Sequence, residues 1–470
     1  YRGPIQENGL PNVFNVFDLD DTKKRAEKTG WHDQTQSVFA SVEVGWKQML
    51  YLTVTGRNDW ASQIAGSSES SFFYPSVGLS WVPTSLWNMG EAFNYLKIRG
   101  SIASVGTPFP RYLTIPTYEY DATNRVWKDK THYPIGDLKP ERTITYEVGL
   151  DARLWKHVNL SVSWYQADTK NQTFDPSLPP SSSYTTIYLQ TGHVRNTGVE
   201  LSAGYDNTWR DFRWATNFTF SWNRNEIIEL AANAVNPVTG EPLNLEKLDI
   251  KGLGKAKYIL KEGGTLNDLY TTSSLRFNDN GYVEVDKSGN LLLTDEGEDI
   301  YLGSVVPDYN LAWRNDFSWK GINLGVLFTG SIGGVCYSAT QANMDLYGVS
   351  EASAAARDAG GVWINGRELV DAQKWYQAIG SQSGLPQYYL YSATNFRLQE
   401  LSLGYTLPAK WFRDKMRMTV SFVGRNLWMI YCKAPFDPAA VASTGLNYQG
   451  IDYFMMPSLR SLGFNVKFQF

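Results

Sequence analysis

The chain has 470 residues, of which 14% are aromatic and only 19% are charged, and its formal net charge is -4. Low charge with many aromatic residues argues against disorder, and the slightly acidic balance argues against a general nucleic-acid binder. Two cysteines and four scattered histidines exclude a disulfide scaffold and a His-based or four-cysteine metal centre. No run of about 18 apolar residues occurs, which excludes transmembrane helices and leaves a membrane β-barrel open, because alternating strands average out as polar.

Alternation of apolar and polar residues with a period of two predicts long strands along most of the chain. Near the C-terminus, for example, Leu462, Phe464 and Val466 alternate with small or polar residues. Thirteen strands are expected, at 35–46, 50–58, 71–83, 93–104, 141–154, 157–170, 193–206, 211–224, 308–319, 322–333, 394–406, 415–430 and 458–470. Many of them run to about 12 residues, which is longer than soluble strands and suits tilted membrane strands.

The connections between these strands alternate strictly in length. The short ones are 47–49, 84–92, 155–156, 207–210, 320–321 and 407–414. The long ones are 59–70, 105–140, 171–192, 225–307, 334–393 and 431–457. Short turns at one end and long loops at the other are typical of outer-membrane barrels, with the turns in the periplasm and the loops outside the cell.

The parity of the strand count predicts that the barrel is larger than this chain. If the last strand ends in the periplasm, thirteen strands place residues 1–34 outside the cell. Bacterial barrels have even strand numbers with both termini in the periplasm. Since the chain also starts at Tyr1 rather than Met, we expect it to be processed or a fragment, the C-terminal portion of a barrel whose other strands cover the edge at 35–46.

Two of the long loops, 225–307 and 334–393, are expected to be structured extracellular loops. The first contains short β-pieces, and the second reads as helical over Glu351–Ala359 and Leu369–Ile379. A connection of about 60 residues without a function is uncommon.

Three further features of the sequence bear on metal binding, disulfides and catalysis. Lys287–Asn290 is expected to form a hairpin turn rather than a calcium loop, because Leu291 stands where such a loop needs Gly. Cys336 and Cys432 both follow upward strands, so they either form an extracellular disulfide or remain two free, separately buried thiols. No Ser-His-Asp or Cys-His grouping is present, so no catalytic residue is predicted and the chain is not expected to be an enzyme.

The inward face of the barrel should carry charged side chains that pair with one another and keep the channel hydrated, or guide a substrate. The lumen charges singled out are Arg153, Arg213, Arg314, Arg397 and Glu400.

Tryptophans near strand ends predict aromatic girdles at the two membrane interfaces. The alternative is that these tryptophans pack in the core of a soluble β-sandwich. Loop aromatics could stack on sugar rings or peptide side chains, or pack against other loops or a partner protein. The residues proposed for this contact are Tyr118, Trp127, Tyr184, Tyr188, Tyr347, Trp363 and Tyr388.

Several stretches, taken together and in order, resemble the SusC/RagA-type TonB-dependent outer-membrane transporters. They are Phe73–Trp81, Leu96–Ser101, Leu138–Arg142, Glu147–Asp151, Asn196–Glu200, Phe396–Leu398, Leu401–Pro408, Arg425–Leu427, Asp437–Pro438 and Phe470. The resemblance implies a 22-stranded antiparallel barrel in the bacterial outer membrane, of which this chain would be the last thirteen strands. It also implies that Phe470 is the terminal aromatic residue read by the barrel-assembly machinery.

The same resemblance implies a function and a set of partners. The function is active import of oligosaccharides or peptides. Three other classes of protein remain as alternatives to an importer: a passive porin, a surface adhesin barrel, and a secreted β-rich enzyme or carbohydrate-binding protein. The partners are an N-terminal plug domain with a TonB box, the TonB–ExbB–ExbD complex, a SusD-like surface lipoprotein that acts as a lid, and outer-membrane lipids. A homodimer of transporter–lid pairs is one further partner to consider. No cofactor is implied, and the degenerate stretch around Asp286 does not support calcium.

Overall fold

One antiparallel sheet of thirteen strands dominates the computed structural model, and each strand pairs with its neighbours in chain order. The structure describes residues 19–20, 22, 32–111, 113–114, 118–121, 126–129, 132–133, 138–174, 186–230, 246–294, 298–442 and 448–470. The thirteen strands are β1 (Thr35–Trp46), β2 (Leu50–Ala61), β3 (Phe72–Trp81), β4 (Phe93–Thr107), β8 (Glu141–Leu154), β9 (Val158–Phe174), β11 (Leu189–Trp209), β12 (Phe212–Glu229), β17 (Tyr309–Trp319), β18 (Ile322–Ile332), β23 (Asn395–Thr406), β24 (Arg417–Cys432) and β26 (Ser461–Gln469). All thirteen predicted strands are confirmed in the predicted order.

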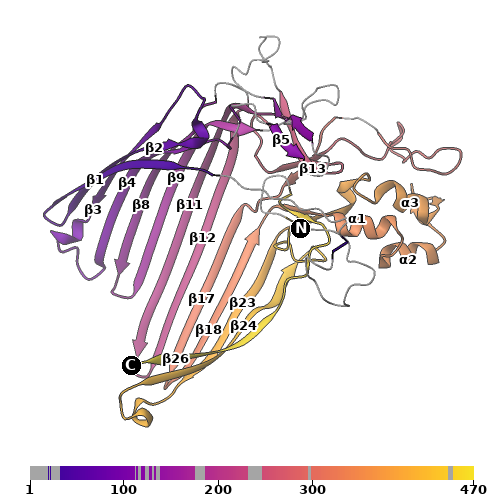
Figure 1. Cartoon of the computed structure of the whole chain (residues 1–470). Coiled ribbons are helices and arrows are strands. Elements are labelled where there is room, and N and C mark those ends of the chain that lie inside the picture. Colours follow the sequence, from indigo (N-terminus) through magenta and orange to yellow (C-terminus); the bar gives the residue numbers. More distant parts are fainter. Residues whose placement is uncertain are drawn as a thin grey trace.

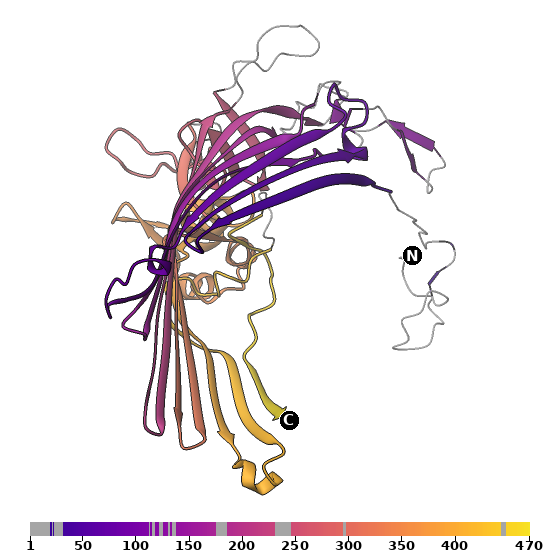
Figure 2. The same ribbon diagram turned by 90° about the vertical axis from the view of Figure 1, so that its left-hand side faces the viewer.

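The sheet is strongly curved and open. Its hairpin turns lie together at one end, here called the turn end, and its long connections lie at the opposite end, the loop end (Figure 1). A view turned by 90° shows the strands bending around a hollow (Figure 2). The pairing order begins at β1 and ends at β26 without joining them, so the described strands form part of a barrel wall.

Antiparallel register, shifted by a few bulges, keeps the polar side chains of successive strands on one face along most of the sheet. Asp151 of β8, for instance, lies opposite Lys97 of β4 and Ser161 of β9. The other face exposes large apolar side chains such as Val148, at 55%, and Leu403, also at 55%. An apolar face of this kind is what contact with lipid requires, while the polar face can border water.

The loop end carries a folded body, here called the cap, which comprises residues 246–294, 298–305, 334–393 and 448–452. It contains a four-stranded sheet, three short helices and smaller ladders. Its strands are β13 (Lys247–Leu253), β14 (Ala256–Lys261), β15 (Asp268–Thr271), β16 (Ile300–Ser304), β19 (Val335–Ser338), β20 (Val362–Ile364), β21 (Glu368–Val370), β22 (Leu390–Ser392) and β25 (Ile451–Asp452). Its helices are α1 (Ala339–Leu346), α2 (Glu351–Asp358), α3 (Ala372–Ile379) and the 3-10 turn η4 (Pro386–Tyr389).

Outside the cap there are a few smaller elements. They are the strands β5 (Tyr118–Asp121), β6 (Val126–Asp129), β7 (His132–Tyr133) and β10 (Thr186–Ile187), with 3-10 turns η2 (Ser62–Ile64), η3 (Pro83–Ser85) and η5 (Ala409–Phe412). β5 and β6 form a hairpin of their own, and β7 pairs in parallel with β10. No helix of the described residues is long and apolar enough to cross a membrane.

Side-chain caps explain where the cap helices begin. Ser338 accepts a hydrogen bond from the Gln341 backbone N–H at the start of α1, and Asp371 does the same for Lys374 at the start of α3. The predicted helix at 351–359 is found as α2. The prediction of a helix from Leu369 is corrected, because the backbone before the Asp371 cap pairs as β21 instead. The helix α1 was not predicted.

The largest buried apolar cluster lies in the cap and fastens it to the sheet. It joins Val194 of β11 and Ile227 of β12 to Leu260, Tyr337 and Ile451 of the cap. Three connections that are distant in sequence therefore share one core above the loop end of the sheet.

Candidate functional site

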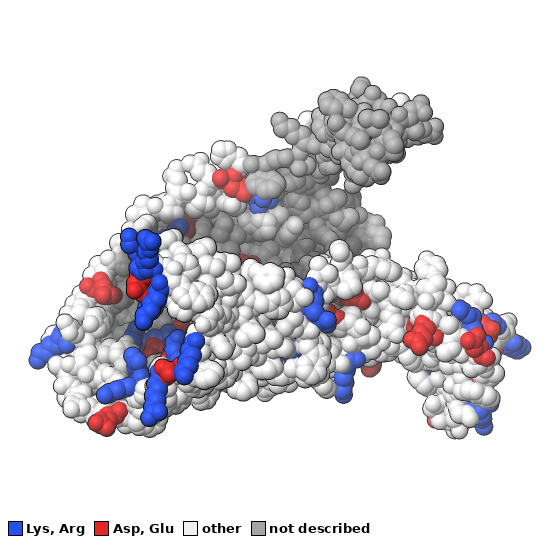
Figure 3. All heavy atoms as spheres, turned by 90° about the horizontal axis from the view of Figure 1, so that it is seen from below, with Lys and Arg blue, Asp and Glu red and all other residues white. Residues whose placement is uncertain are grey.

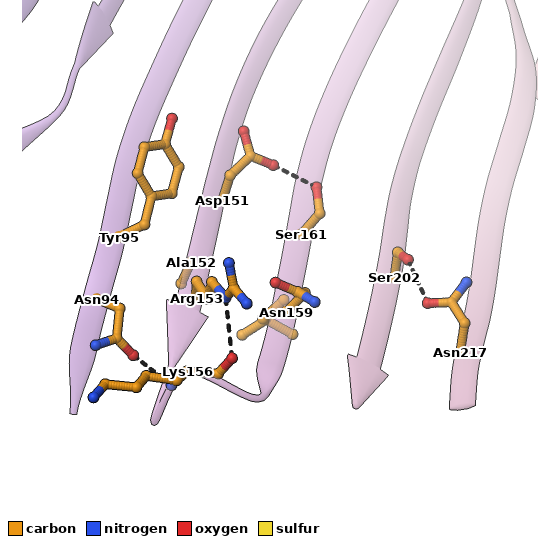
Figure 4. Close-up of a pocket in the computed structure, with 11 residues that line it drawn as sticks. Asn94, Tyr95, Asp151, Ala152, Arg153, Lys156, Asn159, Ser161, Ser202 and Asn217 are labelled. Carbon is orange, nitrogen blue, oxygen red and sulfur yellow. Dashed lines mark hydrogen bonds between the residues drawn. The ribbon is translucent and has the colours of Figure 1, made fainter. Parts of the chain in front are cut away.

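The polar face is hollowed near the turn end into a pocket of about 720 Å³. Figure 4 shows its lining, which comes from β4, β8, β9, β11 and β12 and from Lys156 in the turn between β8 and β9. Ser161 Oγ donates to Asp151 Oδ1 at 2.6 Å, and Ser202 Oγ donates to Asn217 Oδ1 at 3.2 Å. Neutral hydroxyl and amide groups thus alternate with charged ones, which gives a passing polar solute exchangeable hydrogen-bond partners.

A second pocket of about 500 Å³ continues the hollow toward the loop end. It shares Ser161 and Ser202 with the first pocket. The rest of its lining combines hydroxyl and amide side chains with two charged residues, Arg99 and Glu200, and five apolar residues. The hydroxyl and amide members are Ser163, Thr219, Ser221, Asn310, Thr329 and Ser331. The two pockets together form a polar track along the strands, from here on called the polar track.

Arg99 closes the side of this track by an ion pair with two carboxylates. Its guanidinium donates to Glu147 and has its Nε 3.5 Å from Asp151 Oδ2. Gly149, between those two carboxylates on β8, lies directly opposite Arg99. A Cβ on Gly149 would come within 2.8 Å of the Arg99 guanidinium, so the absence of a side chain makes room for this pair.

Three strands share a second network around Glu400. Arg314 Nε lies 2.8 Å from Asp316, and Arg314 Nη1 lies 3.3 Å from Glu400. Arg425 Nε lies 3.0 Å from the other oxygen of Glu400. The predicted residues Arg314 and Glu400 are therefore brought together and balanced by neighbouring charges.

The other predicted charges are placed separately. Arg213 pairs with Asp206, and both side chains are about half exposed. Arg153 lines the pocket near the turn end and donates its Nε–H to the Lys156 carbonyl at 3.1 Å.

Arg397 differs from the other four because it is buried. It is 8% exposed and donates from both terminal nitrogens to Asp437, at 2.8 and 3.0 Å. Burial by itself would raise the pKa of Asp437. The hydrogen bonds from Arg397, from the Ala439 backbone and from Ser458, with the charge of Arg397, together outweigh burial and hold that pKa below its usual value. Asp437 belongs to the last long loop, so Arg397 ties this loop to the sheet.

The loop aromatics are spread over three places within the described residues. Tyr347 and Trp363 are 75% and 66% exposed on the cap, and Tyr388 packs edge-on against Trp375 there, with ring centres 5.8 Å apart. Trp127 is 69% exposed on β6. Tyr188 packs against a small cluster that contains Ile64 and Phe109.

Two other predicted aromatics cannot be placed as side chains. Tyr118 begins β5, of which only the backbone is described. Tyr184 lies outside the described residues.

The cap holds a pocket of about 270 Å³ that the sequence did not reveal. Asp345 lines it, is only 3% exposed, and accepts a hydrogen bond from Ser350. Arg357 and Tyr376 lie on its other sides. These side chains meet only through the packing of α1, α2 and α3, so no local sequence signal marks them.

Of the two alternatives for the cysteines, the structure has free thiols. Cys336 and Cys432 are both free, and the alternative of a disulfide is not found. They are not separately buried, because Cys432 is only partly buried and packs against the small apolar cluster that contains Cys336, Ala393 and Ala434. Burial raises the pKa of the Cys336 thiol to about 12, which makes it a poor nucleophile.

The predicted hairpin turn after Asp286 is confirmed. Asp286 accepts hydrogen bonds from the backbone N–H groups of Ser288 and Asn290, both at 2.8 Å. These bonds, with that of Asn290 first, lower the pKa of Asp286 and occupy its carboxylate. No group of three or more metal-ligating side chains is found in the described part of the chain.

Comparison with known proteins agrees with this architecture. Residues 3–427 match the family described as TonB dependent receptor-like, beta-barrel, and the chain belongs to that family. Its members are outer-membrane proteins of Gram-negative bacteria, so the predicted relation to SusC/RagA-type proteins and the predicted location are both confirmed.

Named relatives and solved structures show how much of such a protein the chain represents. It is 25% identical to TonB-dependent receptor P3 of Formosa agariphila, covering 98% of this chain and 48% of that protein. It is 21% identical to TonB-dependent receptor SusC of Bacteroides thetaiotaomicron, over 71% of this chain and 32% of SusC. The RagAB peptide transporter is similar in fold, with a TM-score of 0.70 and 20% identity over 98% of this chain and 50% of that one. The chain thus spans about half the length of the curated relatives it matches most fully.

Proposed function

We propose that this chain forms the C-terminal wall of an energy-coupled importer that carries oligosaccharides or peptides across the outer membrane. The observation that supports this best is the polar track, which offers hydroxyls, amides and charged groups of both signs along the strands. A polar solute can move along such a surface by exchanging hydrogen bonds from one group to the next. No covalent chemistry is required.

The open edges of the sheet support its place in a larger barrel. All twelve residues of β1 and all nine of β26 are exposed. An unpaired strand edge is not viable in lipid. We therefore propose that further strands of the same protein pair with these edges, and that a plug domain fills the hollow of the closed barrel.

Energy coupling and a lid complete the proposal. The plug would carry the TonB box through which TonB–ExbB–ExbD pulls, and a SusD-like lipoprotein would cover the loop end. The RagAB assemblies, which are similar in fold, are described as a peptide importer, and this makes a peptide as reasonable a cargo as a glycan.

Within this proposal, the predicted site residues have different roles according to where they lie. Arg153, Arg213, Arg314 and Glu400 would form the wall of the path, and Arg397 would hold the last loop in place. The exposed cap aromatics Tyr347 and Trp363 would stack on cargo at the entrance. Phe470, which is 98% exposed at the C-terminus, would serve as the assembly signal.

Uptake of labelled cargo tests the proposal against a passive porin or an adhesin. Cells that carry the complete transporter would be given fluorescent oligosaccharide and peptide mixtures, with TonB present or deleted. Import that disappears without TonB supports the proposal. Import that continues without TonB would identify a porin, and surface binding without import would identify an adhesin.

A further inference from the structure

The hairpins at the turn end repeat one short motif. Of the six turns there, all within the described residues, five place a tryptophan next to a basic residue. The pairs are Trp46–Lys47, Trp155–Lys156, Trp209–Arg210, Trp319–Lys320 and Lys410–Trp411. The five tryptophans are between 47% and 69% exposed. They and their basic neighbours are called the Trp–cation ring below.

Several tryptophans of this ring face the lipid side. Trp46, Trp209 and Trp319 are each in register with the apolar face of their strand, the face opposite the polar track. Amphipathic indole rings prefer the boundary between lipid tails and headgroups. The basic residue next in sequence is therefore held at headgroup depth.

Turn geometry does not account for the basic residues. Lys47, Lys156, Arg210 and Lys320 all adopt a left-handed conformation, with φ of 50°, 66°, 54° and 46°. Asn and Gly adopt this conformation most easily, and Asn-Gly is the usual choice for such tight turns. A long basic side chain recurs at positions where the backbone conformation favours Asn or Gly. This recurrence indicates that the positive charge is functional.

The turn end as a whole is basic although the chain is acidic. Its turns hold seven basic side chains: Lys47, Lys156, Arg210, Lys320, Lys410, Arg413 and Lys415. They hold three acidic ones: Glu91, Asp211 and Asp414. The 470 residues together have a net charge of -4. Seen from below, basic side chains are the more prominent at the left-hand end, where the hairpin turns lie (Figure 3).

Lys156 lines the pocket of the polar track, and the contacts of the other ring members leave most of their charge available. The Lys47 and Lys320 ammonium groups lie 5.0 and 5.5 Å from the ring centres of Trp46 and Trp319, so each cation sits beside its own indole. Lys320 also lies 3.9 Å from Asp211, but both side chains are more than 60% exposed, and such a pair is weak.

We propose that the Trp–cation ring binds anionic phospholipid headgroups of the inner leaflet of the outer membrane. Each indole would lie at the headgroup boundary while the adjacent ammonium or guanidinium contacts the lipid phosphate. A soluble acidic partner would need the cations but not the neighbouring lipid-facing indoles, so their repeated pairing favours a lipid. The ring would then set the depth of the barrel in the membrane.

Quenching of tryptophan fluorescence by brominated lipid tests this binding directly. The complete transporter in detergent micelles would be titrated with brominated phosphatidylglycerol and, separately, with brominated phosphatidylcholine. A basic residue near an anionic surface favours binding by roughly fivefold at low salt. We expect the wild type to bind phosphatidylglycerol at least fivefold more tightly than phosphatidylcholine, and to lose this preference in high salt.

The decisive variant is the triple substitution Lys47→Asn, Arg210→Asn, Lys320→Asn. Asn tolerates the left-handed turns at least as well as Lys or Arg, so folding is preserved while three charges are removed. The matched control removes three exposed basic side chains at the loop end: Lys139→Asn, Lys287→Asn and Lys433→Asn. The turn-end variant should lose the preference for phosphatidylglycerol, and the control should keep it.

Three outcomes would overturn the proposal. The first is a wild type that binds the two lipids equally. The second is a turn-end variant that keeps its preference for phosphatidylglycerol, and the third is a control that loses this preference as fully as the turn-end variant. Equal quenching by phosphatidylcholine in all three proteins would show that each is folded and in contact with lipid.

Discussion

At the scale of single residues, the ion pairs of this chain are of two kinds. Arg397 and Asp437 are about 10% and 9% exposed as side chains, and they join a strand to the last long loop. Arg213 and Asp206 are about half exposed and lie on adjacent strands. A buried pair is costly to break because one charge remains without a partner, whereas an exposed pair contributes little.

Replacing Arg397 by Ala should therefore destabilise the last loop strongly. Leaving the Asp437 charge buried and alone is expected to cost about 3 kcal/mol, against about 0.5 kcal/mol for Arg213→Ala. Hydrogen exchange of residues 433–442 would measure the loss. The double variant Arg397→Ala, Asp437→Ala should recover part of it, and equal exchange rates in Arg397→Ala and wild type would contradict the prediction.

The same pair predicts a dependence on pH. The pKa of Asp437 is lower in the folded chain than in the unfolded chain, so its pairing stabilises the fold above about pH 4, the usual range for an unfolded Asp. That contribution is lost as the pH falls through the lower, folded-state pKa. The difference in free energy of unfolding between wild type and Asp437→Asn should stay constant from pH 7 to 5 and shrink below pH 4. A difference that grows on acidification would refute this.

At the scale of elements, local pattern was enough to define the strands. A period of two is a property of neighbouring residues, and all thirteen strands follow from it. The stretch Glu147–Asp151 shows what the pattern could not indicate. It matched a family motif, but only the register with β4 shows that Gly149 lies under the Arg99 guanidinium.

Replacing Gly149 by Ala should displace Arg99 from Glu147 and Asp151. Because these side chains are about one-third exposed, we expect a loss of about 1 kcal/mol in the free energy of unfolding. Urea unfolding of the protein in micelles, followed by tryptophan fluorescence, would measure it. Gly78→Ala is the control, since the nearest atom to its Cβ would be 3.9 Å away. The explanation fails if both variants lose the same amount.

At the scale of the whole molecule, the sheet and the cap are stabilised in different ways. The sheet turns an apolar face outward and a hollow polar face inward, so its strands rely on pairing and lipid contact. The cap has a conventional buried core that draws on three separate connections. This division predicts that the cap can be loosened without opening the sheet.

Leu260→Ala tests that division. Leu260 is fully buried in the cap core, and its truncation should cost about 3 kcal/mol there. Limited proteolysis should then cut both 246–294 and 334–393 faster, while the sheet keeps its resistance to unfolding in SDS. Leu369→Ala, at a position 45% exposed, should leave cleavage unchanged. Faster cleavage of only one segment would contradict a shared core.

Sequence alone determined the class of fold, the number and order of the sheet strands and the face on which polar residues lie. All of these depend on neighbours along the chain, because side chains alternate sides in every strand. It also identified the hairpin after Asp286, where local hydrogen bonds decide the conformation.

Only the tertiary structure decided the arrangement at the loop end. It brought Cys336 and Cys432 into one cluster without a disulfide, buried Arg397 against Asp437 and spread the loop aromatics apart. It also built the cap, with the helix α1 and the sheet β13–β16 that the sequence did not predict. These features depend on contacts between segments far apart in the chain, and packing between such segments leaves no periodic signal in either one.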